Sequence, residues 1–134
     1  MQLLVLQGIP GSGKTTYTRE FIKEKTDWVR ISRDDLRNMR GDYWIPRQEK
    51  LISYMEDTMV LRALLNGFNV LIDATNLNAE VIQKWTGYAK IYGADLEFKM
   101  FNITLEEAIK RDNLRPQPVG EKVITDFFYK YISK

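Results

Sequence analysis

The chain contains neither cysteine nor histidine among its 134 residues. These absences exclude disulfide bonds, thiolate or histidine zinc sites, and Ser–His–Asp triads. Any proton transfer therefore falls to Asp, Glu, Lys, Tyr or water. The chain also lacks the roughly 18 consecutive apolar residues of a membrane span, and the apolar run at 3–6 is too short for a signal-peptide core. We therefore expect a cytoplasmic protein that does not enter a membrane.

The composition is that of a folded domain, with 44% hydrophobic and 28% charged residues. The length, together with the absence of repeats and linkers, predicts a single domain over residues 1–134. The net charge of +2 suits an anionic ligand in general and does not by itself indicate nucleic acid.

Short apolar runs alternate with segments of helical periodicity along the whole chain. Strands are expected at 2–7, 28–31, 68–73 and 94–101, and helices at 15–25, from 32, 47–66, 78–92, 104–115 and 121–133. In the long helix at 47–66, the apolar face is expected to contain Ile52, Met55, Met59 and Ala63. The alternation predicts an α/β fold, with a central parallel sheet of about four strands, helices on both faces, and ligands at the carboxyl ends of the strands.

The segment Gly8–Thr15 reads GIPGSGKT and fits the phosphate-loop pattern G-x-x-x-x-G-K-[ST] at every fixed position. Glycines let successive backbone N–H groups point at phosphate oxygens, and the following helix adds its positive dipole end. Lys14 is expected to contact the β- and γ-phosphates, and the hydroxyl of Thr15 to ligate Mg²⁺. The residues expected to bind the nucleotide here are Gly8, Pro10, Gly11, Ser12, Gly13, Lys14, Thr15 and Thr16. The pattern predicts a P-loop NTPase fold that binds ATP and Mg²⁺.

The residues after the third strand separate the classes of P-loop protein. Val70–Asp73 ends in an aspartate suited to contact Mg²⁺, directly or through water. The next residue is Ala74, whereas many ATPases place there a glutamate that activates water, and the chain has no N-K-x-D motif for guanine. A kinase is therefore the favoured class.

A kinase needs a group that accepts the proton of the acceptor hydroxyl. Asp34 and Arg37 are three residues apart and share one helix face, so that Asp34 could accept the proton while Arg37 binds a substrate phosphate. A surface ion pair is the alternative interpretation of these two residues. Asp35, at the third position after Ser32, is favoured as part of a helix cap.

Cations over the transferred phosphate are expected from the segment around 111–120. Arg111 and Arg115 lie one helical turn apart, and Pro116, Pro118 and Gly120 then interrupt the helix. This arrangement indicates a lid whose arginines stabilise charge at the transition state. A solvated helix C-terminus, which favours arginine through the helix dipole, is the alternative.

Taken together, four motifs resemble the polynucleotide 5′-hydroxyl kinases, in particular the kinase domain of the phage 5′-kinase/3′-phosphatase. They are the phosphate loop, RDDLR at 33–37, DATNLNAE at 73–80 and KRDNLR at 110–115. The resemblance covers essentially the whole chain and implies phosphoryl transfer from ATP to the 5′-hydroxyl of DNA or RNA. The segment at 73–80 departs from the family pattern by one additional residue between Asp73 and the TNLN sequence.

The resemblance also implies roles for individual residues. Asp34 would be the general base, Arg37 would bind the phosphate on the 3′ side of the acceptor nucleotide, and Arg115 would be the lid arginine. Arg111, with Val119, would flank the adenine, and Asp73 would support the metal and its water shell. We expect neither a phosphatase domain nor a partner domain within the chain.

Two other function classes remain open from the residues alone. A P-loop kinase for a small molecule, such as a nucleoside, would use the same catalytic groups, and a regulatory ATP-binding module would need only Gly8–Thr15. Basic residues around Asp34 favour an extended anionic substrate, although Asp34 and Asp35 lie among them. Tyr43 and Trp44, expected in a loop, are candidates for stacking on bases, whereas Trp85 is expected in the core.

Overall fold

The computed structural model describes residues 1–39, 41, 44–116 and 118–132. Four parallel strands form one sheet in the order β2-β3-β1-β4, with bounds β1 Gln2–Gln7, β2 Trp28–Ser32, β3 Asn69–Asp73 and β4 Asp95–Met100. The two central strands read as continuous apolar runs because both of their faces are covered. The α/β fold, its parallel sheet and the four expected strands are confirmed.

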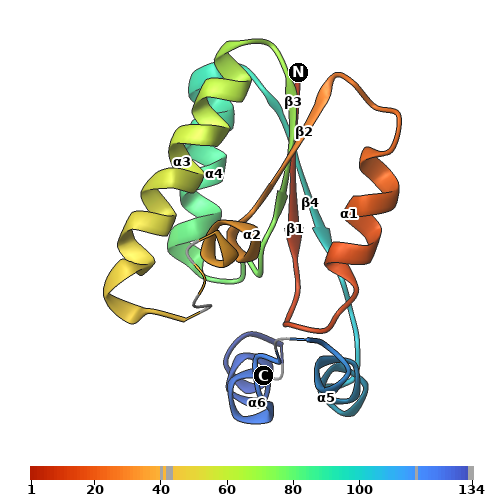
Figure 1. Ribbon diagram of the computed structural model, residues 1–134. Coiled ribbons are helices and arrows are strands. Elements are labelled where there is room, and N and C mark those ends of the chain that lie inside the picture. The colour runs from red at the N-terminus through yellow and green to blue at the C-terminus, as the bar shows by residue number, and fades with distance from the viewer. Residues whose placement is uncertain (40, 42–43, 117, 133–134) are drawn as a thin grey trace.

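Helices cover both faces of the sheet, as Figure 1 shows. Helices α3 (Glu49–Leu65) and α4 (Ala79–Tyr92) pack on one face, and α1 (Lys14–Ile22) packs on the other. Helix α2 (Arg33–Asn38) directly follows β2, and a 3₁₀ turn at Pro46–Gln48 precedes α3. Within the described ranges, no helix has the length and apolar character needed to cross a membrane.

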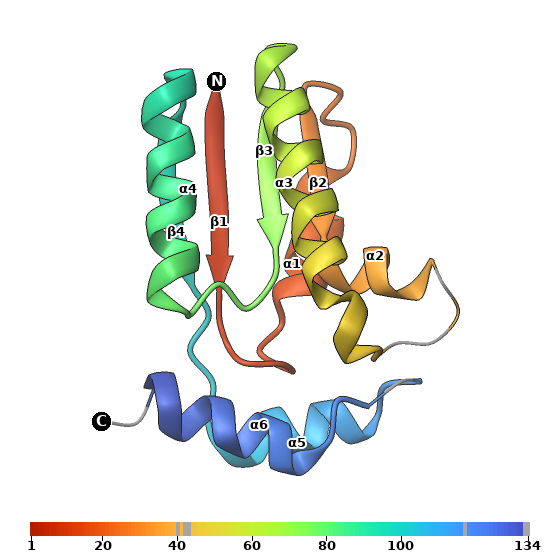
Figure 2. The same cartoon turned by 90° about the vertical axis from the view of Figure 1, so that its left-hand side faces the viewer.

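Two further helices lie beyond the carboxyl ends of the strands. Figure 2 shows α5 (Leu105–Asn113) and α6 (Glu121–Phe127) side by side below the strand tips. A π-helical segment, Phe128–Ile132, follows α6. The pair therefore closes the edge of the sheet where ligands of α/β proteins bind.

The expected helix caps are confirmed by hydrogen bonds at the helix starts. The Ser32 hydroxyl accepts a bond from the Asp35 N–H at 3.3 Å, and Thr104 accepts one from Glu107 at 3.1 Å. Asn78 accepts a bond from Glu80 at 2.7 Å. Each side chain satisfies an N–H that has no partner within its own helix.

Two helix expectations are wrong in detail. The fully buried residues of α3 are Ile52, Glu56, Val60 and Leu64, and Ala63 packs against the core. Ile52 and Ala63 are therefore confirmed, whereas Met59 is 43% exposed. The apolar pattern missed this face because a glutamate occupies one of its four positions. The C-terminal helix does not continue to 133 as one α-helix, since it changes to π-helical geometry at Phe128.

The α5–α6 pair is attached to the rest of the protein through the phosphate loop itself. Ile9, Ala108 and Ile124 form a buried cluster that joins the loop to both helices. At Gly11, where φ is +84°, a Cβ would lie only 2.5 Å from the carbonyl oxygen of Ala108. Only glycine permits this approach, so the backbones of the loop and of α5 are in direct contact.

We expect the Gly11→Ala variant to be destabilised by about 1–3 kcal/mol, because the added methyl group must displace α5. The effect is measured by the unfolding temperature and by the affinity for ATP, and both values should decrease. Gly87→Ala is the matched control, because Gly87 lies inside α4 with nothing within 4 Å of its Cβ position. That variant should be more stable by about 0.5–1 kcal/mol. Equal unfolding temperatures for the two variants would contradict the contact.

Candidate nucleotide and acceptor site

A cleft of about 1370 Å³ lies at the carboxyl edge of the sheet, between the phosphate loop, α2 and the α5–α6 pair. All but one of the residues predicted to form the site line it, the exception being Gly8. The structure thus brings together four sequence motifs that are up to about 100 residues apart.

Lys14 is folded back onto its own loop. Its ammonium group donates to the carbonyls of Gly8 at 3.0 Å and Ile9 at 2.9 Å, and to the hydroxyl of Ser12 at 3.2 Å. Burial lowers the pKa of Lys14 to about 8, although the carboxylates of Asp73 and Asp34 act in the opposite direction. A cation this poorly hydrated is well placed to bind phosphate oxygens, because little water must be removed from it.

Asp73 lies behind the loop and binds several donors through one oxygen. Its Oδ2 accepts bonds from Thr15 at 3.3 Å and Thr18 at 3.2 Å, and from the guanidinium of Arg30 at 2.7 Å. Figure 1 places the two elements involved, the end of β3 and the start of α1, at the same edge of the sheet. The predicted metal residues Thr15 and Asp73 are therefore adjacent.

The donor set at Thr15 and Asp73 fits Mg²⁺ in its usual P-loop form. Mg²⁺ prefers oxygen ligands and commonly binds through one or two carboxylates together with substrate phosphates and water. Among the described residues no group of three or more acidic side chains could hold a metal alone. Thr15 and Asp73 would therefore hold the ion jointly with the phosphates of the nucleotide.

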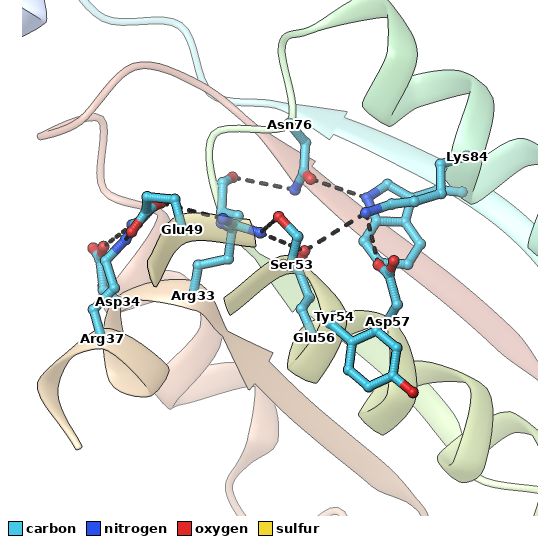
Figure 3. A network of polar contacts seen from close by, with 12 residues as sticks. Arg33, Asp34, Arg37, Glu49, Ser53, Tyr54, Glu56, Asp57, Asn76 and Lys84 are labelled. Atoms are coloured by element: carbon cyan, nitrogen blue, oxygen red, sulfur yellow. Dashed lines mark hydrogen bonds and ion pairs between the residues drawn. The ribbon is translucent and has the colours of Figure 1, made fainter. Parts of the chain in front are cut away.

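Asp34 and Arg37, on α2, form an ion pair with 2.9 Å between Oδ1 and Nη1 (Figure 3). Arg37 also makes a bidentate contact with Glu49, at 2.9 Å from Nε and 2.6 Å from Nη2. A bidentate arginine–carboxylate pair fixes the plane of the guanidinium. Glu49, at the start of α3, thus orients Arg37, a role that the sequence reasoning missed because a glutamate in a first helical turn is unremarkable.

A second layer of charges lies behind this pair. Arg33 contacts Glu49 at 3.3 Å and Glu56 at 3.1 Å, and Lys84 of α4 lies 3.9 Å from Glu56 (Figure 3). Glu56 is 1% exposed, and its burial raises the pKa of the carboxyl despite these cations. The chain of charges runs from α4 through α3 and α2 to Asp34.

Arg115 approaches Asp34 from the opposite wall of the cleft. It lies 3.6 Å from Asp34 and 3.6 Å from Asp112. The predicted lid arginine and the predicted general base are therefore neighbours, while Arg111 lies nearer the phosphate loop, 3.4 Å from the Cβ position of Gly13. Arg111 pairs with Glu107 at 3.2 Å and is about half exposed.

Asp112 is a further residue that the sequence reasoning missed. It is fully buried and accepts hydrogen bonds from the backbone N–H groups of Val119 and Gly120, each at 2.9 Å. These bonds tie the proline-containing loop and the start of α6 to the end of α5. The available signal was an aspartate shortly before a segment of Pro and Gly, where backbone donors need acceptors.

Asn76, behind the phosphate loop, likewise joins separate segments of the chain by hydrogen bonds. It adopts a left-handed conformation with φ at 46° and is 5% exposed. Its side chain donates to the carbonyl of Leu6 at 2.7 Å and accepts from the indole of Trp85 at 3.0 Å. Asn76 thus joins the end of β1 to α4, and the expectation that Trp85 lies in the core is confirmed.

The aromatic pair proposed for base stacking is only partly described. Tyr43 lies outside the described residues. Trp44 lines the cleft, is 60% exposed, and has the guanidinium of Arg37 at 5.8 Å from the centroid of its ring.

We expect Asp112→Asn to lower the free energy of unfolding by about 1–3 kcal/mol, because an amide accepts fewer hydrogen bonds and presents its own donors to two backbone N–H groups. Chemical unfolding and the KM for ATP measure the loss, and the KM should rise. The control is Asp126→Asn, which removes an exposed pair with Lys122 and should change stability by less than about 0.5 kcal/mol. A variant at Asp112 that behaves like this control would contradict the role of Asp112.

The chain resembles known proteins along nearly its whole length. The chain is 30% identical over 148 residues to a protein named as a bifunctional polynucleotide kinase/RNA ligase in Autographa californica nuclear polyhedrosis virus, covering 98% of this chain and 21% of that protein. It is 26% identical to the L-seryl-tRNA(Sec) kinase of Methanococcus maripaludis, covering 96% of this chain and 52% of that kinase. The chain thus spans about half or less of these relatives.

Solved structures also resemble this chain. A chain in a structure of the Pnkp1/Rnl/Hen1 RNA repair complex has a TM-score of 0.84 and 35% identity, covering 96% of this chain and 43% of that chain. A gluconokinase from Sinorhizobium meliloti, at 15% identity and a TM-score of 0.64, shares the fold alone. These findings confirm the resemblance to polynucleotide kinases. A family model described as AAA domain matches residues 3–131, and the chain belongs to that family.

Proposed function

We propose that the protein transfers the γ-phosphoryl group of ATP to the 5′-hydroxyl of a nucleic-acid strand. The observation that carries the proposal is the position of Asp34, which is paired with Arg37 on one side and lies 3.6 Å from Arg115 on the other, in the cleft that also contains Lys14. An anionic base between two cations and a phosphate loop is the arrangement that phosphoryl transfer to a hydroxyl requires. The relatives named as polynucleotide kinase and as part of an RNA repair complex support the nucleic-acid acceptor.

The acceptor side of the reaction is assigned to α2. Asp34 takes the proton of the 5′-hydroxyl as the oxygen attacks the γ-phosphorus and the bond to the departing ADP breaks, and the ion pair with Arg37 orients the Asp34 carboxylate. Arg37 binds the phosphate on the 3′ side of the acceptor nucleotide. Glu49 holds the guanidinium of Arg37 in place before the strand arrives.

The donor side is assigned to the phosphate loop and the lid. The residues from Pro10 to Thr16 bind the phosphates of ATP, with Lys14 on the β- and γ-phosphates. Arg115 binds the charge that develops on the transferred group, and Arg111 and Val119 flank the adenine. Residues 111–120 form the lid, which Asp112 braces internally. Thr15 and Asp73 would hold Mg²⁺, which would neutralise phosphate charge when bound.

The proposal is tested by transfer of labelled γ-phosphate from ATP·Mg²⁺ to a 5′-hydroxyl oligonucleotide, with nucleosides and gluconate as parallel acceptors. We expect labelling of the oligonucleotide alone. Asp34→Asn should lower kcat by about 100- to 10,000-fold with ATP binding retained, because an amide cannot accept the proton. Chelation of Mg²⁺ should abolish transfer.

The matched control is Asp35→Asn at the neighbouring carboxylate. Asp35 pairs with Arg30 at 2.6 Å and does not line the cleft, so its replacement should leave kcat within a few-fold of the original value. Labelling of a nucleoside or of gluconate in place of the oligonucleotide would overturn the nucleic-acid assignment and keep the kinase. Equal loss in both variants would remove Asp34 as the base.

A further inference from the structure

Trp44 is a large aromatic residue that is not part of the hydrophobic core of the described residues. The other two tryptophans are part of the core: Trp85 is fully buried, and Trp28 packs against Phe21 with 4.8 Å between ring centroids. Trp44 is 60% exposed and belongs to none of the three apolar clusters formed by the described residues. Trp44 is nevertheless one of the residues that line the cleft.

The surroundings of Trp44 place it on the acceptor side of the cleft. The guanidinium of Arg37 lies over the indole ring at 5.8 Å from the centroid, and the same guanidinium contacts Asp34 at 2.9 Å. Indole, guanidinium and carboxylate are therefore consecutive neighbours. The groups assigned to the adenine, Arg111 and Val119, belong to the α5–α6 wall and not to α2.

From this juxtaposition we propose that Trp44 stacks on the base of the acceptor's 5′-terminal nucleotide. The inference rests on the proposed function and adds to it a binding site for the base. With the hydroxyl at Asp34 and the adjacent phosphate at Arg37, the base of that nucleotide is left to be bound by the group next to Arg37. An exposed indole is suited to this task, because every base offers a π-face and stacking tolerates any sequence.

Stacking by Trp44 also explains why both Glu49 and Trp44 contact the guanidinium of Arg37. Glu49 fixes the plane of the Arg37 guanidinium through two hydrogen bonds, and the guanidinium lies over the indole ring of Trp44 at 5.8 Å from its centroid. The guanidinium and the indole thus form a two-part platform, in which one part binds phosphate and the other binds a flat ring. A single-stranded end satisfies both parts, whereas a small acceptor without a base satisfies only one.

The test compares two oligonucleotide acceptors that differ only in the 5′-terminal base. One carries a normal base, and the other carries an abasic sugar that retains its 5′-hydroxyl. Trp44→Ala should raise the KM of the normal acceptor about tenfold and leave the KM of the abasic acceptor unchanged. Trp44→Phe should restore most of the affinity, and the KM of ATP should remain constant in every variant.

Tyr54→Ala is the matched control, because Tyr54, labelled on α3 in Figure 3, is 71% exposed and is not among the residues that line the cleft. It should affect neither acceptor. An equal rise of KM on both acceptors would overturn stacking and show that Trp44 only supports Arg37. No change on either acceptor would also overturn it. Failure of the original protein to phosphorylate either oligonucleotide would overturn the proposed function, and this inference with it.

Discussion

The backbone of α5 lies against the phosphate loop with no side chain between them, and much of the site depends on this contact. Gly11 makes the approach possible, and Ile9 extends it into an apolar cluster with Ala108 and Ile124. From behind, the N–H of Gly8 donates to the carbonyl of Thr75 at 3.1 Å. The loop is thus held between two parts of the chain, so that its N–H groups are oriented before any phosphate arrives.

Three carboxylates position most of the polar residues around the site. Asp73 orders Thr15, Thr18 and Arg30 through one oxygen, Glu49 orders Arg37, and Asp112 orders the loop before α6. Each is a carboxylate with several donors, which is the form in which a buried or partly buried charge is stable in a protein. These carboxylates lie at the end of β3, at the start of α3 and on α5, so the sheet and the helices fix the residues that hold the proposed substrate-binding groups.

Motifs with fixed spacing could be predicted from the sequence, and so could the fold that carries them. The phosphate loop, the caps at Ser32 and Thr104, and the alternation of strands and helices each depend on local chemistry that a sequence displays directly. Glu49 and the buried face of α3 could not be found in this way, because their partners, Arg37 and Arg33, are brought to them only by tertiary folding. Asp112 differs, because its partner, the N–H of Val119, is only seven residues further along the chain and the sequence carried a local signal for it.

Glu56 has a consequence for how this protein can be altered. Its carboxylate sits at 1% exposure between Arg33 of α2 and Lys84 of α4, so that one buried negative charge is shared by cations from two other helices. Removing a single partner from a buried ion pair destabilises a protein by about 3–5 kcal/mol, whereas exchanging the whole set for apolar residues of similar volume can be neutral. Positions 33, 56 and 84 are therefore coupled. Because Arg33 also pairs with Glu49 and Lys84 pairs with Asp57 at 2.7 Å, a designer who repacks the α3–α4 face must account for five charged side chains together.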